Sequence, residues 1–175
     1  MIYTCTLDTP LGVMTASAER GALTGLWFFG QKYYPSKTGE WACEPDHAVF
    51  EALRIWLDCY FSGKDSMPEL RIDPPGMPFQ KDVWDILLKI PFGQITTYGG
   101  IAKRLAVQRG LSSMSAQAVG GAVGHNPISI LIPCHRVVGS NRSLTGYAAG
   151  LDKKEALLRL EHVDMTKGFF DIIKT

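Results

Sequence analysis

A run of three prolines and one glycine near the middle of the chain limits the possible folds more than any other feature. The run spans Asp73-Pro74-Pro75-Gly76-Met77-Pro78. Its prolines lack a backbone N–H donor, and Gly76 is free to adopt turn conformations. No helix or strand is expected to continue through it. The length of 175 residues fits one compact domain or two small ones. We therefore expect an N-terminal domain over 1–72, a linker over 73–78 and a C-terminal domain over 79–175.

The part before the linker has the pattern of a small antiparallel sheet covered by a helix. Residues 2–7, 13–18 and 23–29 are β-prone runs separated by turn residues, which predicts a meander. From Asp46 onward, apolar residues recur at helical spacing until Gly63, so Asp46 is the expected N-cap and Gly63 the expected stop. The N-terminal domain is therefore expected to be α+β.

The part after the linker is expected to be mainly helical. Apolar spacing predicts helices over about 79–90, 98–106, 114–124 and 152–162. Thr96 or Thr97 is a candidate cap for the second of these, and Ser112-Ser113 for the third. A helix, a short turn and a helix suggest a helix-turn-helix of winged-helix-like type, although an ordinary helical hairpin is commoner at such spacing. The whole chain is therefore assigned to the α+β class.

Charge is distributed unevenly along the chain. Residues 1–85 hold 12 acidic and 7 basic side chains, residues 86–151 hold six basic and no acidic ones, and residues 152–175 hold five of each. A carboxylate-free stretch with a cationic surface would suit a polyanion such as nucleic acid. A weakly charged, glycine-rich stretch without such a partner fits the same numbers about equally well.

Composition also bears on location and on metals. No apolar run approaches the roughly 18 residues needed to cross a bilayer, and the N-terminus lacks the basic and apolar regions of a secretion signal. We expect a cytoplasmic protein without a membrane contact, in which Cys5, Cys43, Cys59 and Cys134 are free thiols. Cys43 and His47 lie four apart, but no second close pair completes a tetrahedral zinc site. Neither a metal nor a cofactor is expected.

One cysteine has neighbours that suit chemistry. Residues 130–138 form an apolar, strand-like run interrupted by Cys134, His135 and Arg136. A thiol is only a few per cent ionised at pH 7, and a nearby imidazole or cation lowers its pKa and makes it a nucleophile. Strand neighbours point to opposite faces, so adjacency alone does not prove contact. For the other cysteines, the role of a small buried hydrophobic residue is the commoner one.

The motif Pro133-Cys134-His135-Arg136-Val137 closely resembles the active-site motif of the O6-alkylguanine-DNA alkyltransferases, also called methylated-DNA–protein-cysteine methyltransferases. The resemblance is strong over residues 78–162, and the N-terminal part agrees only in general layout. Its further matches are Phe92-Gly93, Thr97-Tyr98, Ala118-Val119-Gly120-Gly121-Ala122, Asn126-Pro127, Gly146-Tyr147, Gly150-Leu151, Lys154 and Glu161.

This resemblance implies a role for each catalytic candidate. Cys134 matches the alkyl acceptor, His135 the base that activates it through a water, and Glu161 the carboxylate that orients that histidine. Asn126 matches a residue that braces the turn before the cysteine. By its own context, Glu161 would be an ordinary surface residue of a helix. The implied reaction moves an alkyl group from O6 of guanine, with O4 of thymine as a possible second donor, irreversibly to Cys134, so each protein molecule acts once.

The resemblance also implies a surface for alkylated double-stranded DNA, bound by a monomer. Tyr98 matches a tyrosine that crowds the target phosphate and helps to rotate the base out, and Lys154 and Tyr147 match residues that line the base pocket. Flipping is chemically necessary because O6 of guanine lies inside the stack. The family is thought to use its recognition helix in the minor groove. The DNA-facing set is Tyr98, Gln117, Ala118, Gly120, Gly121, Arg136, Tyr147, Ala148 and Ala149.

Three positions depart from the family pattern. Gln117 stands where an arginine usually fills the space left by the flipped base, and residues 109–115 make the preceding turn longer than in many relatives. Ala148 and Ala149 replace the usual Ser or Gly, which would narrow the pocket. Three other functions stay open: a damage-binding relative without transfer, which would lack Cys134; a cysteine hydrolase; and a DNA-binding regulator.

Overall fold

The computed structural model describes residues 1–174, which divide into two compact units. One unit comprises Met1–Pro75 together with Pro127–Ser129, and the other comprises Gly76–Asn126 and the chain from Ile130 onward. The division after Pro75 falls inside the segment expected to be a linker. Residues 127–129, which were expected to belong with the C-terminal domain, cluster instead with the N-terminal unit. The domain bounds expected from the sequence stay a prediction.

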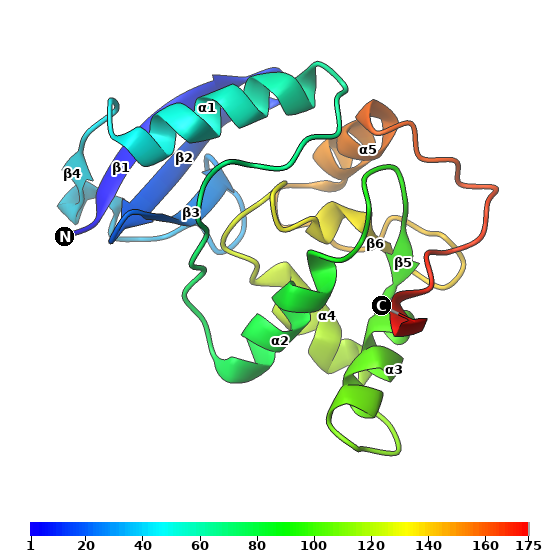
Figure 1. Cartoon of the computed structure of the whole chain (residues 1–175). Coiled ribbons are helices and arrows are strands. Elements are labelled where there is room, and N and C mark those ends of the chain that lie inside the picture. The colour runs from blue at the N-terminus through cyan, green and yellow to red at the C-terminus, as the bar shows by residue number, and fades with distance from the viewer. Residues whose placement is uncertain (175) are drawn as a thin grey trace. The chain divides into compact units, whose positions relative to one another are not determined.

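The first unit contains the expected antiparallel meander. Strands β1 (Tyr3–Thr9), β2 (Gly12–Glu19) and β3 (Ala22–Phe28) pair in turn, and the sheet order is β3-β2-β1-β4 (Figure 1). The fourth strand, β4 (Ala42–Cys43), follows a short 3-10 turn, η1 (Thr38–Glu40), and pairs parallel to β1. At the other edge, the backbone N–H of Leu26 donates to the Pro127 carbonyl at 2.8 Å. This bond explains why residues 127–129 join this unit.

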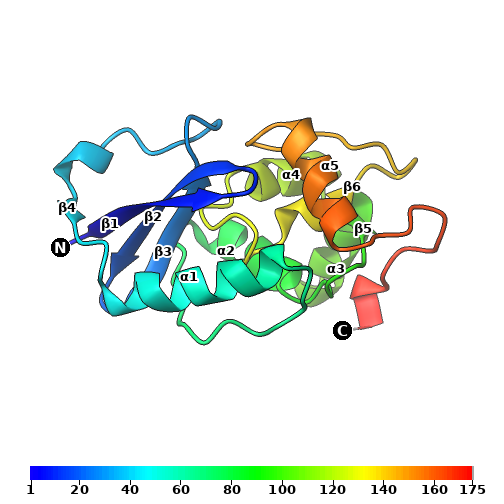
Figure 2. The ribbon, with the colours of Figure 1, turned by 90° about the horizontal axis from the view of Figure 1, so that it is seen from above.

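Helix α1 (Ala48–Phe61) runs along one face of this sheet (Figures 1 and 2). Its buried residues are Val49, Phe50, Leu53, Leu57 and Tyr60. The expected N-cap was wrong by one residue. The cap is His47, whose Nδ1 accepts a hydrogen bond from the N–H of Val49 at 3.2 Å, whereas Asp46 lies outside the helix. The expected stop is confirmed, since Gly63 follows the C-cap with a φ of 89° that favours glycine.

The second unit begins with helix α2 (Pro78–Leu87), which has proline at its first position, where no backbone donor is needed. The Gln80 side chain accepts a hydrogen bond from the N–H of Met77 at 2.9 Å. The buried side of α2 carries Val83, Trp84, Ile86 and Leu87. The indole N–H of Trp84 donates to the Ala122 carbonyl at 2.9 Å, which ties this helix to α4.

The expected helix, turn and helix are confirmed as α3 (Tyr98–Gln108) and α4 (Ala116–Gly124), which pack together. Thr97 caps α3 by accepting from the N–H of Gly100 at 2.9 Å. The expected cap for α4 was wrong. Ser115, not Ser112-Ser113, accepts from the N–H of Ala118 at 3.2 Å, so α4 begins two residues later than the apolar spacing indicated.

The strand expected over 130–138 is mostly absent. Only β6 (Val137–Val138) is extended, and it pairs parallel with β5 (Thr96–Thr97). Before it, Ile130 has a φ of 71°, which breaks any strand, and Cys134–Arg136 form a 3-10 turn, η2. The chain ends with helix α5 (Leu151–Leu160) and a 3-10 turn, η3 (Ile172–Lys174).

Helix α5 buries Lys154, Leu157 and Leu158, whereas Leu160 is only partly buried. Leu158 packs with Ile95 and Val138 in a small core cluster. Among residues 1–174, no helix is both long and apolar enough to cross a membrane.

Candidate active site

Cys134 is the first residue of the 3-10 turn η2 and is only 8% exposed. Burial raises the pKa of its thiol above the ordinary value. A hydrogen bond with Asn126, the positive charge of Lys154 and nearby backbone N–H groups oppose that rise without cancelling it. The cysteine is therefore a neutral thiol at physiological pH and needs a base before it can act as a nucleophile.

His135 and Glu161 form a completely buried pair. The imidazole Nε2 lies 2.6 Å from Oε2 of Glu161, and neither side chain has any exposed surface. Glu161 is the C-cap of α5, and His135 is the middle residue of η2. The structure thus brings together the expected base and its expected orienting carboxylate, and it excludes the view of Glu161 as an ordinary surface residue.

The other ring nitrogen of His135 is the chemically available one. Nδ1 is buried and hydrogen-bonds to no group within residues 1–174. With Nε2 donating to Glu161, Nδ1 carries the lone pair and can accept a proton directly or through a water. Burial lowers the pKa of His135; Glu161 raises it, and the charges of Arg136 and Lys154 lower it again. The net lowering keeps the ring neutral at physiological pH, as a general base must be.

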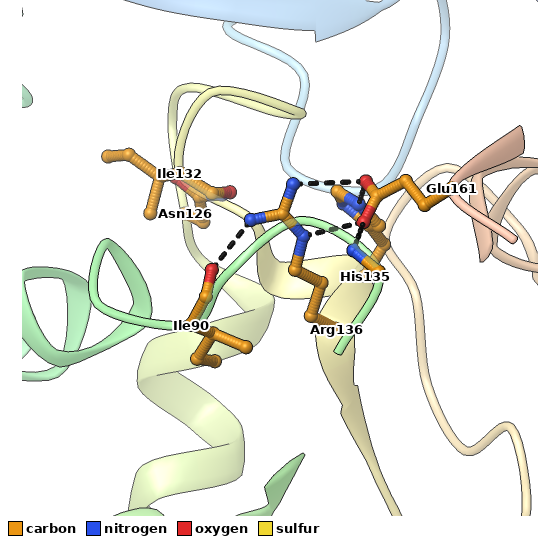
Figure 3. A network of polar contacts seen from close by, with 7 residues as sticks. Ile90, Asn126, Ile132, His135, Arg136 and Glu161 are labelled. Carbon is orange, nitrogen blue, oxygen red and sulfur yellow. Dashed lines mark hydrogen bonds and ion pairs between the residues drawn. The ribbon is translucent and has the colours of Figure 1, made fainter. Parts of the chain in front are cut away.

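Arg136 binds the same carboxylate from another side (Figure 3). Its Nε donates to Oε1 of Glu161 at 2.8 Å, its Nη2 donates to Oε2 at 3.1 Å, and its Nη1 donates to the Ile90 carbonyl at 2.7 Å. The side chain is only 11% exposed. Arg136 was expected to face DNA, and this geometry instead commits its guanidinium to the buried network.

A fourth donor to Glu161 comes from the backbone. The N–H of Gly93 donates to Oε1 at 3.0 Å, and a Cβ at this glycine, whose φ is 80°, would lie 3.2 Å from the Glu161 carbonyl oxygen. Burial would raise the pKa of Glu161, but the hydrogen bonds and charges of His135 and Arg136 outweigh it and hold the pKa well below its usual range. Glu161 is therefore a carboxylate throughout the physiological range.

Asn126 supports the segment that leads to the cysteine. Its side-chain amide donates to the Ile132 carbonyl at 2.8 Å in a buried setting. Between these residues, Ile130 has a φ of 71°, a conformation that a β-branched residue rarely adopts. Such strain costs on the order of 1–3 kcal/mol and persists only where the surroundings impose it.

Lys154 and Tyr98 meet at one backbone carbonyl. The Lys154 ammonium donates to the carbonyls of Val137 at 2.6 Å and of Thr145 and Gly146 at 3.2 Å each. The Tyr98 hydroxyl donates to the same Thr145 carbonyl at 2.8 Å. Burial lowers the pKa of Lys154 to about 8. These bonds hold the loop that carries Tyr147, Ala148 and Ala149, all of them partly buried.

The outer side of α4 is made of small or uncharged residues. Gln117, Ala118 and Gly121 are exposed. Gly120 is partly buried beside Tyr98, where an added Cβ would lie 3.8 Å from the tyrosine ring, and nothing lies within 4 Å of a Cβ at Gly121. A backbone or a nucleic-acid groove can approach this side of the helix closely.

The basic stretch is less available to a partner than its sequence indicated. Four of its six cations donate to groups of the chain itself: Arg104 to the Ile173 carbonyl, Arg109 to Asp82, Arg136 to Glu161, and Arg142 to the Met165 and Lys167 carbonyls. Lys89 and Lys103 are exposed. Sequence reasoning missed these contacts because their acceptors are mostly backbone carbonyls, which residue identity does not reveal.

Backbone groups are also the site members that sequence reasoning missed. The Ile90 carbonyl, the Gly93 N–H and the Thr145 carbonyl each bind a functional side chain. Only Gly93 carried a signal, through the matched pair Phe92-Gly93. The other two became visible only with the fold.

Comparisons with known proteins identify the family of the chain. Residues 78–163 match the family model described as 6-O-methylguanine DNA methyltransferase, DNA binding domain. The chain is 41% identical over 161 residues to the methylated-DNA–protein-cysteine methyltransferase of Mycobacterium tuberculosis, covering 92% of this chain and 93% of that one. The corresponding protein of Haemophilus influenzae is 34% identical over 163 residues, covering 93% and 87%.

Solved structures of the same family have a similar fold. A crystal structure of Mycobacterium tuberculosis O6-methylguanine methyltransferase is similar with a TM-score of 0.79 and 40% identity, covering 93% of each chain. A crystal structure of Mycobacterium tuberculosis OGT in complex with DNA is similar with a TM-score of 0.78 and 38% identity, covering 91% of this chain and 92% of that one.

Proposed function

The chain belongs to the methylated-DNA–protein-cysteine methyltransferase family, and from that premise we propose that Cys134 is the residue that receives the alkyl group. The protein is accordingly a DNA repair protein that transfers a methyl or other alkyl group from O6-alkylguanine in DNA to itself. The observation that carries the proposal is one 3-10 turn that holds both the buried thiol of Cys134 and His135, whose ring is fully buried, paired with Glu161 and left with an accepting Nδ1.

The reaction is a displacement at an sp³ carbon. His135 Nδ1 takes the thiol proton, directly or through a water, and the Cys134 thiolate attacks the alkyl carbon in line with the bond to O6. A carbon–sulfur bond forms, the carbon–oxygen bond breaks, and guanine leaves with the electron pair and gains a proton. The thioether has no hydrolytic exit, so each molecule of the protein reacts once.

The DNA-facing surface is proposed to be the outer side of α4 with the loop held by Lys154 and Tyr98. Gln117, Ala118, Gly120 and Gly121 supply a small-residue face that fits a groove. The base, flipped out of the stack, enters beside Tyr98, Lys154, Tyr147, Ala148 and Ala149. Gln117 is proposed to fill the space that the flipped base leaves, where relatives usually have an arginine. Arg104 and Arg109, the arginines nearest to it along the chain, already bind the Ile173 carbonyl and Asp82.

We further propose that the partner is alkylated double-stranded DNA, that the protein binds it as a monomer, and that it works in the cytoplasm. A cysteine hydrolase would share the Cys134 and His135 pair, but it gives no reason for the exposed small-residue face of α4. A DNA-binding regulator would explain that face and leave the accepting Nδ1 of His135 without a use.

Peptide mass mapping tests the proposal. The protein is incubated with a duplex bearing O6-methylguanine, digested, and searched for added methyl groups at each cysteine. The expected result is one methyl on the peptide that contains Cys134 and none on Cys5, Cys43 or Cys59, which serve as internal controls. Methylation of another cysteine, or of none, would reject Cys134 as the acceptor.

A further inference from the structure

Two side chains, His135 and Arg136, bind the buried carboxylate of Glu161, and only His135 has a place in the reaction above. We propose that Arg136 is a positioning residue for the transfer: by binding and neutralising Glu161, it keeps His135 in the unprotonated form that can take the Cys134 proton. This inference rests on the proposed roles of Cys134 and His135.

The geometry of the Arg136–Glu161 contact is that of a two-point clamp (Figure 3). Nε and Nη2 donate to different oxygens of the carboxylate, which fixes its plane as well as its position. Nη1 donates to the Ile90 carbonyl and so ties the clamp to the segment after α2. A lysine offers a single ammonium and cannot reproduce this planar fork. The carboxylate is thereby held in the orientation from which Oε2 accepts from His135.

Arg136 also offsets the negative charge of Glu161 near His135. Oε2 of Glu161 contacts His135 Nε2 at 2.6 Å and Arg136 Nη2 at 3.1 Å, so the two nitrogens lie within about 6 Å of each other. A lone buried carboxylate at this distance would favour a protonated imidazole. The protonated ring has hydrogens on both nitrogens and cannot accept the thiol proton. Arg136 cancels the charge of Glu161 and removes that pull.

The remaining charged groups that bear on His135 act in the same direction or arise only during the reaction. Lys154, on α5, is the other cation that lowers the pKa of His135, and Cys134 becomes an anion only once its proton has moved. Glu161 is the only carboxylate among the groups that shift this histidine. The balance between Glu161 and Arg136 therefore sets the pH at which the His135–Glu161 pair takes up a proton.

The first measurement uses no DNA and does not depend on transfer. The protonation midpoint of the His135 imidazole is followed by NMR titration in the wild type, in Arg136→Gln and in Arg136→Lys. In Arg136→Gln the midpoint should rise by about one pH unit, the lower end of what one charge at about 4–6 Å produces. Arg136→Lys keeps the charge but loses the fork, so its midpoint should lie between the other two.

The second measurement is the single-turnover transfer rate as a function of pH. Because the neutral imidazole is the active form, the rate rises with pH through this midpoint, and a higher midpoint moves the acidic limb to higher pH. The acidic limb of Arg136→Gln should therefore move upward by the same amount as its NMR midpoint. Arg142→Gln is the matched control, since it removes a cation that binds the Met165 carbonyl and does not touch Glu161.

The possible results distinguish the role of Arg136 from the proposed role of Cys134. An unchanged midpoint in Arg136→Gln, with lowered stability alone, would make Arg136 a structural clamp and overturn the inference. If Arg136→Gln does not fold, Arg136→Lys decides: an upward shift supports the inference and no shift overturns it. If the wild-type protein leaves Cys134 unmethylated, the proposed function is wrong. The NMR midpoints would still measure the effect of Arg136 on the protonation of His135.

Discussion

At the scale of single residues, Glu161 is the point on which the polar groups of the site converge. His135, Arg136 and the Gly93 N–H all donate to its buried carboxylate. The carboxylate is stable there because cationic and neutral donors replace the water it lost. Removing it leaves Arg136 as a buried cation without its counter-charge. The stability of the second unit and the protonation state of His135 therefore both depend on the contact between Arg136 and Glu161.

Glu161→Gln should lower the free energy of unfolding by about 3–5 kcal/mol, the usual cost of removing one partner of a buried ion pair. Urea denaturation at pH 7 measures this loss. Replacing both partners, in Glu161→Gln with Arg136→Met, should recover part of it, because no uncompensated charge stays buried. If the double variant loses the full sum of the two single losses, the two residues are independent and the assigned pair is wrong.

The lowered pKa of Lys154 predicts that the transfer rate falls at alkaline pH. Its positive charge lowers the pKa of Cys134, and its own pKa is lowered by burial to about 8. As pH rises through about 8, the ammonium loses its charge, the thiolate becomes harder to form, and the single-turnover rate should fall. In Lys154→Arg the charge persists to far higher pH, so this fall should disappear. A wild-type rate that is flat from pH 7 to pH 10 would contradict this role.

At the scale of elements, the long helices and strands can be predicted from the period of their apolar residues, and the short ones cannot. The three long strands and the helices have several turns or pairs of apolar residues at a regular period, and the sequence predicts them with small errors at the ends. The strands β4, β5 and β6 have two residues each, too few to show a period. The turn at Cys134 replaces an expected strand because Ile130 adopts a positive φ that apolar pattern cannot reveal.

The candidate site divides in the same way. Cys134, His135 and Glu161 were identified from the sequence because their motif resembles a known one. Arg136 was given an outward role, since nothing in the motif says which way a guanidinium turns. Its true acceptors, Glu161 and the Ile90 carbonyl, lie 25 and 46 residues away along the chain, beyond the reach of any local pattern.

The start of α4 gives a test at this scale. Ser115→Ala should lower the free energy of unfolding by about 1 kcal/mol, because the Ala118 N–H loses its cap. Ser113→Ala is the matched control and should change stability by less than about 0.5 kcal/mol, as exposed substitutions usually do. Thermal or urea unfolding of both variants measures the difference. The reverse order of effects would restore the cap that the sequence pattern suggested.

At the scale of the whole molecule, the positive charge of residues 86–151 overstates the number of cations that are free to bind DNA. The carboxylate-free stretch holds six cations, but four of them bind groups of the chain itself. Lys89 and Lys103 are exposed, and so is Arg109, which pairs with Asp82 at the surface. We therefore expect shape and the flipped base to contribute more to DNA binding than counterion release does.

The salt dependence of duplex binding should therefore be shallow. Each phosphate contact adds about 0.9 to the slope of log affinity against log salt, so two contacts predict a slope near 2 and six would predict more than 5. Fluorescence anisotropy of an unmodified duplex over a range of salt measures the slope. Lys103→Gln should reduce it by about 1, whereas Arg104→Gln should leave it unchanged. A wild-type slope above about 4 would mean that the cations bound to groups of the chain also contact DNA, and it would contradict this expectation.

A count of methyl groups per protein molecule tests the irreversible transfer to Cys134 directly. The protein is mixed with a large excess of duplex bearing O6-methylguanine, and intact protein mass and repaired DNA are followed until both stop changing. Both should reach a plateau at one methyl and one repaired guanine per protein, and Cys134→Ser should gain and repair none. Repaired guanine in excess of protein, or repair by Cys134→Ser, would contradict an irreversible transfer to Cys134.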